Sequence, residues 1–121
     1  MHPLLLFLIF ITFGAQAKEV NFNRDIRPIL SDRCFHCHGP NKKSRKAHLR
    51  FDIPDGKEGA FRVHEESAAI VPGDLKKSQI IYRLTTDDED EKMPPKKANK
   101  KALTTKETAL IKQWIKEGAK W

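Results

Sequence analysis

The sequence predicts a small all-α domain with long loops, whose centre is filled by something other than its own side chains. Three observations support this prediction. Apolar residues recur at helical spacing near both ends of the chain. Large apolar side chains are otherwise few. The only two cysteines lie three residues apart, with a histidine directly after the second, in the segment RCFHCHGP at residues 33–40.

The first 17 residues have a different character from the rest. The apolar run HPLLLFLIFITFG is followed by AQA, the small-x-small pattern of a signal peptidase site. We therefore expect a signal peptide over residues 1–17 and one folded domain over residues 18–121. An uncleaved membrane anchor is the alternative, although a bilayer-spanning helix needs roughly 20 apolar residues. Either interpretation implies export to the periplasm or cell envelope, with membrane contact only through an uncleaved signal.

The size and charge of the expected mature domain limit what it can be. The 121-residue chain carries a formal net charge of +7, and every Lys, Arg, Asp and Glu follows residue 17. A chain of about 100 residues buries only a modest fraction of its surface. Three of the seven phenylalanines fall in the signal segment, so we expect a bound group to complete the core. Nucleic-acid binding would suit the basic charge, but export and the lack of base-stacking motifs argue against it.

Three chemistries compete for Cys34, Cys37 and His38. A disulfide or thiol redox centre suits an exported protein but leaves the histidine unexplained. A zinc site would use the Cys-x-x-Cys pair, but no second Cys pair or His-x₃₋₅-His motif follows it. Covalent haem attachment uses the whole Cys-x-x-Cys-His sequence, which is the c-type attachment motif. The motif therefore favours haem c, whose iron needs axial ligands.

The spacing of the motif has a physical reason. Residues i, i+3 and i+4 of a helical turn face the same way. Cys34 and Cys37 can then reach two vinyl groups along one porphyrin edge, while His38 directs its imidazole toward the iron. Gly39 and Pro40 are expected to end the helix.

A second iron ligand is expected on the opposite face of a six-coordinate haem. Met93 is the only methionine outside the signal segment, and it lies in the polar, proline-rich stretch EKMPPKK. Two prolines stiffen this loop, so a thioether held there loses little entropy on binding. Met93 is the favoured distal ligand, and His48 and His64 are the alternatives.

These residues carry a family resemblance that covers residues 20–121. The sequence resembles a monohaem c-type cytochrome, and more closely the planctomycete-type cytochrome c domain. The resemblance implies a small class I-like cytochrome c fold, covalent haem on Cys34 and Cys37, proximal ligation by His38 and distal ligation by Met93. His48 stands where such domains have a small residue, and similar domains usually head much longer proteins. The matching blocks are FNRDIRPILSDRCFHCHGP, RKAHLRFD, AIVPGD, IIYRLTTDDEDEKMPP and LTTKETALIKQWIKEGAKW.

Local signals predict where the first two helices begin. Phe22, Ile26, Ile29 and Leu30 share helical spacing, with Asp25 as the expected N-cap. This start would place Pro28 in the first turn, whereas an earlier start would put a kink at Pro28. A second helix is expected after Asp74, which would cap it and place Leu75, Ile80, Ile81 and Leu84 on its apolar side. Between them, the alternation in HLRFDIP predicts a short extended segment over residues 49–53.

The last segment gives the clearest helix signal. Thr104 and Glu107 fit a capping box, and Gly118 suits the C-terminal stop. We expect the stripe of Leu110, Ile111, Trp114 and Ile115 to pack across the first helix, so that the two chain ends clasp above the haem. Trp114 is interpreted as core rather than as a haem contact.

The sequence therefore predicts an exported one-electron carrier with haem c held by His38 and Met93, rather than an enzyme. The alternatives are a haem-based enzyme or sensor such as a peroxidase, a fragment of a larger multidomain oxidoreductase, and, least favoured, a zinc or disulfide structural module. Basic residues follow the first expected iron ligand and surround the second, so we expect an acidic redox partner at the haem edge. They are Lys42, Lys43, Arg45 and Lys46 after the first, and Lys92, Lys96, Lys97, Lys100 and Lys101 around the second.

Overall fold

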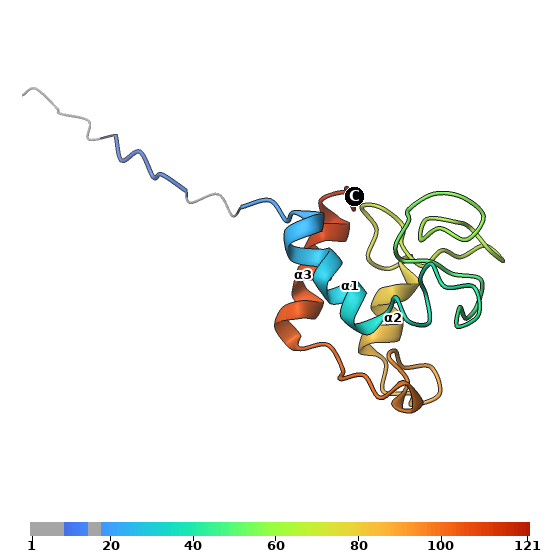
Figure 1. Cartoon of the computed structure of the whole chain (residues 1–121). Coiled ribbons are helices and arrows are strands. Elements are labelled where there is room, and N and C mark those ends of the chain that lie inside the picture. The colour runs from blue at the N-terminus through green and yellow to red at the C-terminus, as the bar shows by residue number, and fades with distance from the viewer. Residues whose placement is uncertain (1–8, 15–17) are drawn as a thin grey trace, which may run out of the picture.

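The computed structural model describes residues 9–14 and 18–121, and in these ranges it is helical with long loops (Figure 1). The described residues contain no strand, only isolated bridges between His64 and Ser67 and between Ala68 and Ser78. The all-α class is therefore confirmed. The elements are a π-helical turn η1 (Phe22–Ile26), helix α1 (Arg27–Arg33), helix α2 (Gln79–Thr85), a 3₁₀ turn η2 (Lys96–Ala98) and helix α3 (Thr105–Lys116).

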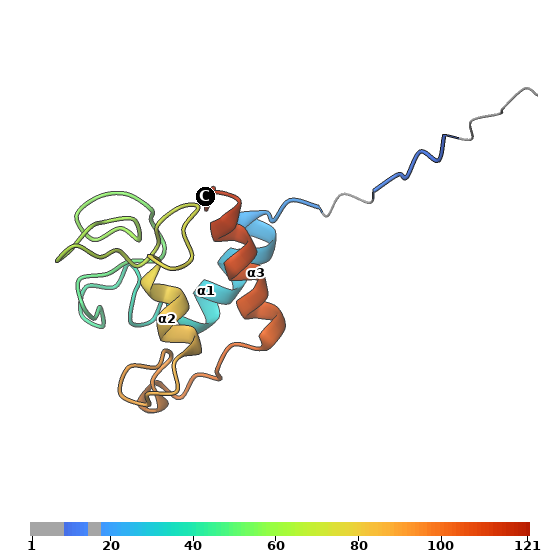
Figure 2. The same ribbon diagram turned by 180° about the vertical axis from the view of Figure 1, so that it is seen from behind.

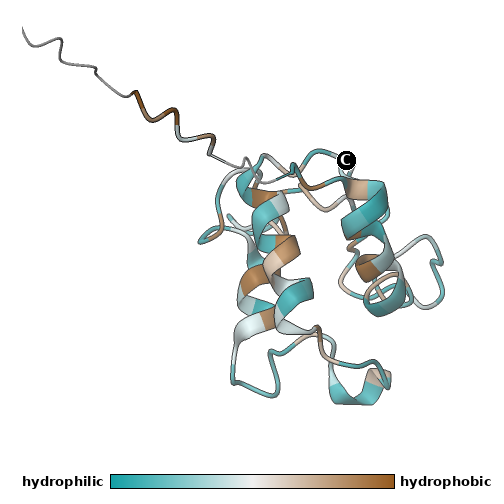
Figure 3. Cartoon of the chain, turned by 90° about the vertical axis from the view of Figure 1, so that its left-hand side faces the viewer, coloured by the Kyte–Doolittle hydropathy of each residue, from teal (hydrophilic) through white to brown (hydrophobic). Residues whose placement is uncertain are grey.

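The described part of the expected signal segment stays apart from the folded domain. Figure 3 shows the apolar residues of 9–14 away from the helices. The side chains of Ile9, Phe10, Ile11 and Phe13 are 77–97% exposed. Residues 1–8 and the expected cleavage site at 15–17 lie outside the described residues, so the signal peptide stays a prediction. Among the described residues, no helix has both the length and the apolar character to cross a membrane.

The N-terminal helical segment begins earlier than expected, and the predicted cap is wrong. Asn21 is the N-cap: its Oδ1 accepts the Arg24 N–H at 2.9 Å, while Asp25 Oδ2 accepts the Asn21 N–H at 2.9 Å. Both ends of this cap are therefore satisfied by side chains. The segment opens as η1 and becomes α-helical at Arg27, just before Pro28. Proline lacks the N–H of a regular ladder, so the change from π to α bonding falls beside it.

Helix α2 begins four residues later than the sequence predicts, at Gln79 rather than at Leu75. Asp74 does not cap it; its Oδ1 accepts the Lys77 N–H at 3.0 Å and so closes a turn before the helix. Ser78 is the N-cap residue and is 1% exposed, with its hydroxyl donating to Asp74 O at 2.7 Å. Ile80 is buried on α2 as expected, whereas Leu75 packs against the core from the turn.

The predicted extended segment does not pair into a strand. Residues 49–53 form an irregular stretch with bends at Phe51 and Asp52. Phe51 is nevertheless 5% exposed. The alternation therefore located an inward-facing aromatic residue but not a strand.

Helix α3 follows the sequence prediction at both ends. Thr104 Oγ1 accepts the Glu107 N–H at 3.1 Å, and Glu107 Oε1 accepts the Thr104 N–H at 3.0 Å, which completes the capping box. At the other end, Gly118 has φ +105°, its N–H donates to Ile115 O, and the Ala119 N–H donates to Trp114 O. This is a Schellman ending, which requires the left-handed backbone that glycine adopts readily.

The two chain ends clasp as predicted. Helix α3 packs against η1, and Figures 1 and 2 show α1 and α3 side by side from opposite directions. The shared core contains Ile26, Ile29 and Leu30 from the N-terminal segment and Ile111, Trp114 and Ile115 from α3. Trp114 is 1% exposed and its Nε1–H donates to Lys120 O at 2.8 Å, so it is a core residue, as expected.

Removing one core side chain should weaken this clasp strongly. Ile115 is fully buried, so Ile115→Ala leaves a cavity and should lower the free energy of unfolding by about 2–5 kcal/mol. Lys116→Ala, on the exposed side of the same helix, should change it by less than about 0.5 kcal/mol. Urea unfolding measures both values. Equal effects of the two substitutions would contradict the packing described.

The ion pair between Arg33 and Glu107 should stabilise the clasp only when the carboxylate is charged. Arg33 Nη1 and Nη2 donate to the two Glu107 oxygens at 3.2 and 3.1 Å. Hydrogen bonding to the Thr104 backbone, with the charge of Arg33, lowers the pKa of Glu107 below 4.5. A lowered folded-state pKa gives stability that is present above the unfolded value and lost as the pH falls through the folded one.

Glu107→Gln keeps the capping hydrogen bond through its amide oxygen, but it removes the negative charge and the acceptor for Arg33 Nη1. We expect it to lower the free energy of unfolding by about 1 kcal/mol at pH 7. The difference from the wild type should vanish as the pH falls well below 4.5. Glu66→Gln, at an exposed site with no ion pair to any described residue, is the control. A difference that persists unchanged in acid would contradict this prediction.

Candidate cofactor site

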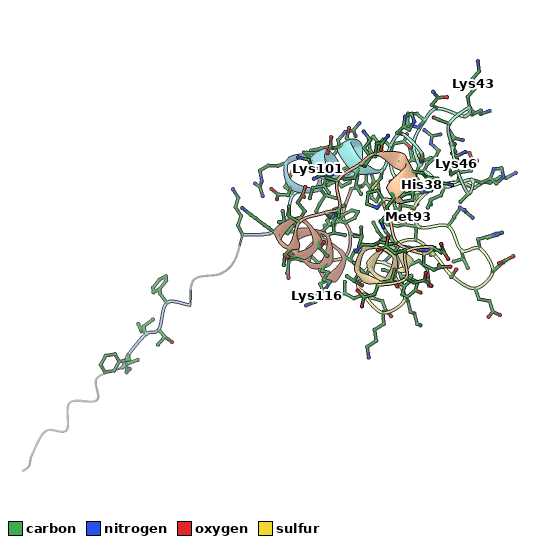
Figure 4. The ribbon with its side chains drawn as sticks, turned by 90° about the horizontal axis from the view of Figure 1, so that it is seen from below. His38, Lys43, Lys46, Met93, Lys101 and Lys116 are labelled. Atoms are coloured by element: carbon green, nitrogen blue, oxygen red, sulfur yellow. The ribbon has the colours of Figure 1, made fainter. Side chains whose placement is uncertain are left out.

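A cavity of about 850 Å³ lies between the end of α1, the 46–51 loop, α2 and the loop after residue 92. Its volume is within the range of small-molecule and cofactor sites. Cys34, Cys37, His38 and Met93 all line it. The fold thus brings together the four residues singled out in the sequence. His38 and Met93 are labelled in Figure 4.

The cysteine motif is a tight turn rather than a continuation of the helix, which corrects the sequence prediction. Helix α1 ends at Arg33, and Cys34 is its C-cap. The Cys37 and His38 N–H groups both donate to Cys34 O, at 3.2 and 2.7 Å. The His38 bond spans one helical turn, so the two thiols and the imidazole still lie close together.

Gly39 allows the chain to leave this turn. A Cβ atom at position 39 would lie 2.1 Å from Phe35 O, which no side chain tolerates. Its role is therefore close backbone approach, not the helix stop that the sequence predicts. The turn is tied to the next loop by the Lys46 N–H, which donates to Cys37 O at 2.7 Å, and by the Phe51 N–H, which donates to His38 O at 2.8 Å.

The His38 ring is oriented by a backbone carbonyl. Its Nδ1 lies 3.2 Å from Lys46 O. A carbonyl oxygen only accepts, so Nδ1 carries the proton and Nε2 keeps its lone pair. Burial lowers the pKa of His38 below its ordinary value, against the opposing hydrogen bonds to the 46–49 backbone. The Phe51 ring meets the imidazole edge-on at 5.7 Å between centroids. The residue is thus a neutral imidazole with one nitrogen available to a metal.

The two cysteines are free thiols, not a disulfide. Burial raises the pKa of Cys34 to about 12, so this thiol stays protonated at neutral pH. Within residues 9–14 and 18–121, no group of three or more His, Cys, Asp or Glu side chains is placed to hold a metal ion. The structure therefore does not favour the disulfide and zinc alternatives over covalent attachment.

Met93 is held against α2 by its backbone. Its N–H donates to Arg83 O at 2.8 Å, and the Met93–Pro94 peptide bond is cis. The Arg83 guanidinium binds Glu91 O at 3.2 Å and pairs with the Glu91 carboxylate at 2.5 Å. The loop before Met93 is thus fixed to α2 at two points, and the methionine is only half-exposed on the cavity wall.

The remaining histidines differ in their relation to the cavity. His48 does not line it; its side chain is 91% exposed and lies 3.4 Å from Glu58. His64 does line the cavity, but its side chain is 69% exposed. His36 also borders the cavity from the middle of the motif and is exposed.

The rest of the wall fits a group with an apolar body and an anionic part. Its apolar residues include Leu49, Phe51, Ile80 and Leu84. A buried Arg62 Nε has no hydrogen-bond partner in the described part of the chain, and Arg62 also lines the cavity. A porphyrin with carboxylate side groups fits this cavity. It would find two thiols for its vinyl groups, an imidazole nitrogen for its iron, an apolar wall for its ring and an unpaired guanidinium N–H for a carboxylate.

Sequence reasoning missed several residues of this site. The Lys46 carbonyl, the Arg83 anchor and the Arg62 guanidinium carry no local signal, because each acts through a contact far along the chain. Of these residues, Phe51 was the one with a local sequence signal, the apolar alternation over residues 49–53.

Comparison with known proteins identifies a family whose members carry a cofactor of the kind that this cavity fits. The model of one protein family, described as "Planctomycete cytochrome C", matches residues 34–97, just over half of the chain. No curated protein and no solved structure matches it. The matched segment runs from the first cysteine of the motif to just beyond Met93, and so spans most of the cavity wall. The chain therefore belongs to the planctomycete cytochrome c family, a membership that implies a covalently bound haem and a role in electron transfer.

Proposed function

We propose that this protein is an exported one-electron carrier whose haem c is attached through Cys34 and Cys37 and ligated by His38 and Met93. One observation carries the proposal. Met93, far along the chain from the cysteine motif, lines the same cavity as His38. Two thiols, an imidazole nitrogen and a thioether are then available to a single group.

Each residue has a distinct task in this proposal. The haem iron supplies the one-electron couple. Cys34 and Cys37 hold the group by thioether bonds, and His38 offers Nε2 while the Lys46 carbonyl fixes its ring. Met93 offers its sulfur from a loop tied to α2, and a methionine ligand raises the reduction potential relative to histidine. The apolar residues of the wall would limit the water near the iron, so that little solvent rearranges when its charge changes.

The class I-like arrangement is part of the proposal. In it, N- and C-terminal helices cross above the haem. The packing of α3 on η1 supports it, because α1 runs from that contact directly to Cys34 at the cavity wall.

Export through a signal peptide at residues 1–17 is also part of the proposal, with residues 18–121 as the mature domain. Apolar side chains of residues 9–13 lie exposed and add nothing to the core, as suits a segment that is removed. In this proposal the carrier works in the periplasm or at the cell envelope.

The ligand set can be tested by replacing Met93. The wild type, produced with haem-attachment machinery, should keep its haem through a denaturing gel and give a low-spin ferric spectrum with the weak far-red band of a methionine ligand. Met93→Ala should lose that band and bind cyanide at least tenfold faster, because the sixth position opens.

His64→Ala is the matched control, since His64 lines the same cavity. It should leave the spectrum unchanged. A low-spin Met93→Ala protein beside a high-spin His64→Ala protein would assign the distal ligand to His64. A high-spin wild type that binds peroxide readily would favour the haem-enzyme alternative, and a colourless wild type would end the proposal.

A docking surface for an acidic redox partner completes the proposal. Lys46, Lys97 and Lys100 are exposed residues that border the cavity (Lys46 is labelled in Figure 4). Two other members of the basic clusters have partners of their own. Arg45 has a 6% exposed side chain bound to Glu58, Gly39 O and Pro40 O, and Lys96 pairs with Glu89 at 3.3 Å. We therefore leave Arg45 out of the proposed docking surface and build it on the cavity-bordering lysines.

Electron transfer from an acidic redox protein should slow as salt rises, because screening weakens the attraction of the docking surface. Replacing Lys46, Lys97 and Lys100 together with Gln should lower the bimolecular rate constant about tenfold at low ionic strength. Lys116→Gln, on the exposed side of α3 and away from the cavity, should leave it unchanged. Stopped-flow reduction over a salt series measures this. A flat salt response, or equal effects of both replacements, would contradict the docking surface.

A further inference from the structure

Arg62 is a cavity residue whose hydrogen bonds are incomplete. Its Nη2 donates to Ala47 O at 2.7 Å. Its Nε is buried and has no acceptor within the described residues. A buried donor on a charged group is costly to leave unpaired, so this N–H is expected to meet an acceptor that the polypeptide does not supply.

The other two arginines on the cavity wall already have carboxylate partners. Arg33 binds Glu107 and Asp32, and Arg83 binds Glu91. Arg62 forms no ion pair with any described residue. Among the residues that the structure describes, Asp90 is the one acidic residue bordering the cavity, and it is exposed. The cavity wall therefore carries an excess of positive charge. Arg62 is a partly buried cation on this wall that lacks a carboxylate partner.

We propose that Arg62 binds a carboxylate of the haem, one of the two propionate groups, and thereby sets the reduction potential. This inference rests on the proposed function, because it needs the haem in the cavity. A guanidinium presents parallel N–H donors in a planar fork that matches a carboxylate, which a lysine ammonium cannot reproduce.

The contact to Ala47 connects Arg62 with the loop that orients His38. Lys46 O faces the His38 Nδ1, and the next carbonyl, Ala47 O, accepts from Arg62. Ala47 and His48 both have left-handed backbones, with φ of +55° and +49°, which non-glycine residues adopt rarely. Such strained residues persist where surrounding contacts hold them. Arg62 would therefore link a propionate to the backbone turn behind the proximal histidine.

Removing the positive charge should favour the ferric state, because an uncompensated carboxylate then lies near the iron. At a fixed ambient potential, Arg62→Gln should lower the ferrous-to-ferric ratio on the order of tenfold, which is about 59 mV for a one-electron couple. The haem propionate bending band in the resonance Raman spectrum should also shift, since it reports the hydrogen bonding of that carboxylate.

Two further variants separate this role from general charge and from folding. Lys97→Gln removes an exposed cation from the same cavity wall and should change the ratio far less, because solvent screens it. Arg62→Lys keeps the charge but loses the fork, so it should retain most of the ratio while the Raman band still shifts. If Arg62→Gln yields no folded protein, the position of the propionate band in the Raman spectrum of Arg62→Lys tests the proposal.

Spectroelectrochemistry and resonance Raman spectroscopy of the haem-loaded proteins provide both readouts. An unchanged propionate band in the Arg62 variants, or equal potential shifts in Arg62→Gln and Lys97→Gln, would overturn the assignment. Neither outcome touches the proposed function, which fails instead if the wild type carries no haem or shows no methionine ligation.

Discussion

The packing of α3 against the N-terminal helical segment is the constraint on which the rest of the molecule depends. Ile26 and Leu30 on one side and Ile111 and Ile115 on the other are almost fully buried. This contact fixes the direction of α1, and α1 ends one residue before the first cysteine. The bidentate pair between Arg33 and Glu107 holds that end to the start of α3. The position of the cysteine motif is thus set by a core that lies beside the cavity rather than in it.

Most of the cavity wall consists of loops that are held by backbone hydrogen bonds instead of regular structure. The turn at residues 34–38 is joined to the 46–51 loop, and the Met93 loop is joined to α2. A small chain with few large apolar residues cannot fill such a wall with its own side chains. The covalently bound haem that the family membership implies would supply apolar contacts there. It would also account for the two thiols, the neutral imidazole and the thioether that line one cavity.

The basic residues near the cavity fall into groups with different environments. Arg33, Arg45 and Arg83 each bind a carboxylate of the chain and stabilise local structure. Lys97 and Lys100 remain exposed at the cavity edge, where they would attract an acidic partner. Arg62 belongs to neither group, since it is partly buried and lacks a carboxylate of its own. This difference in environment is the basis on which we propose different tasks for residues of the same charge.

The sequence by itself determined the features that depend on near neighbours. Such features arise from hydrogen bonds and periodicity within one or two helical turns. They include the turn of the Cys-x-x-Cys-His motif, the capping box at Thr104, the stop at Gly118 and the apolar stripe of α3. The apolar stripes of the two terminal helices also predicted the all-α class and the clasp of the chain ends, because such stripes must be buried against another element.

Only the tertiary structure decided which distant groups meet. No local sequence pattern indicated several of the contacts that shape the site. They are the caps at Asn21 and Ser78, the carbonyl of Lys46 behind His38, the anchoring of Met93 by Arg83 and the unpaired Nε of Arg62. Several residues near each helix start were chemically able to cap it, and the surrounding packing selected one. Long-range hydrogen bonds form only once the chain has folded, so the sequence shows their donors and acceptors without showing how they pair.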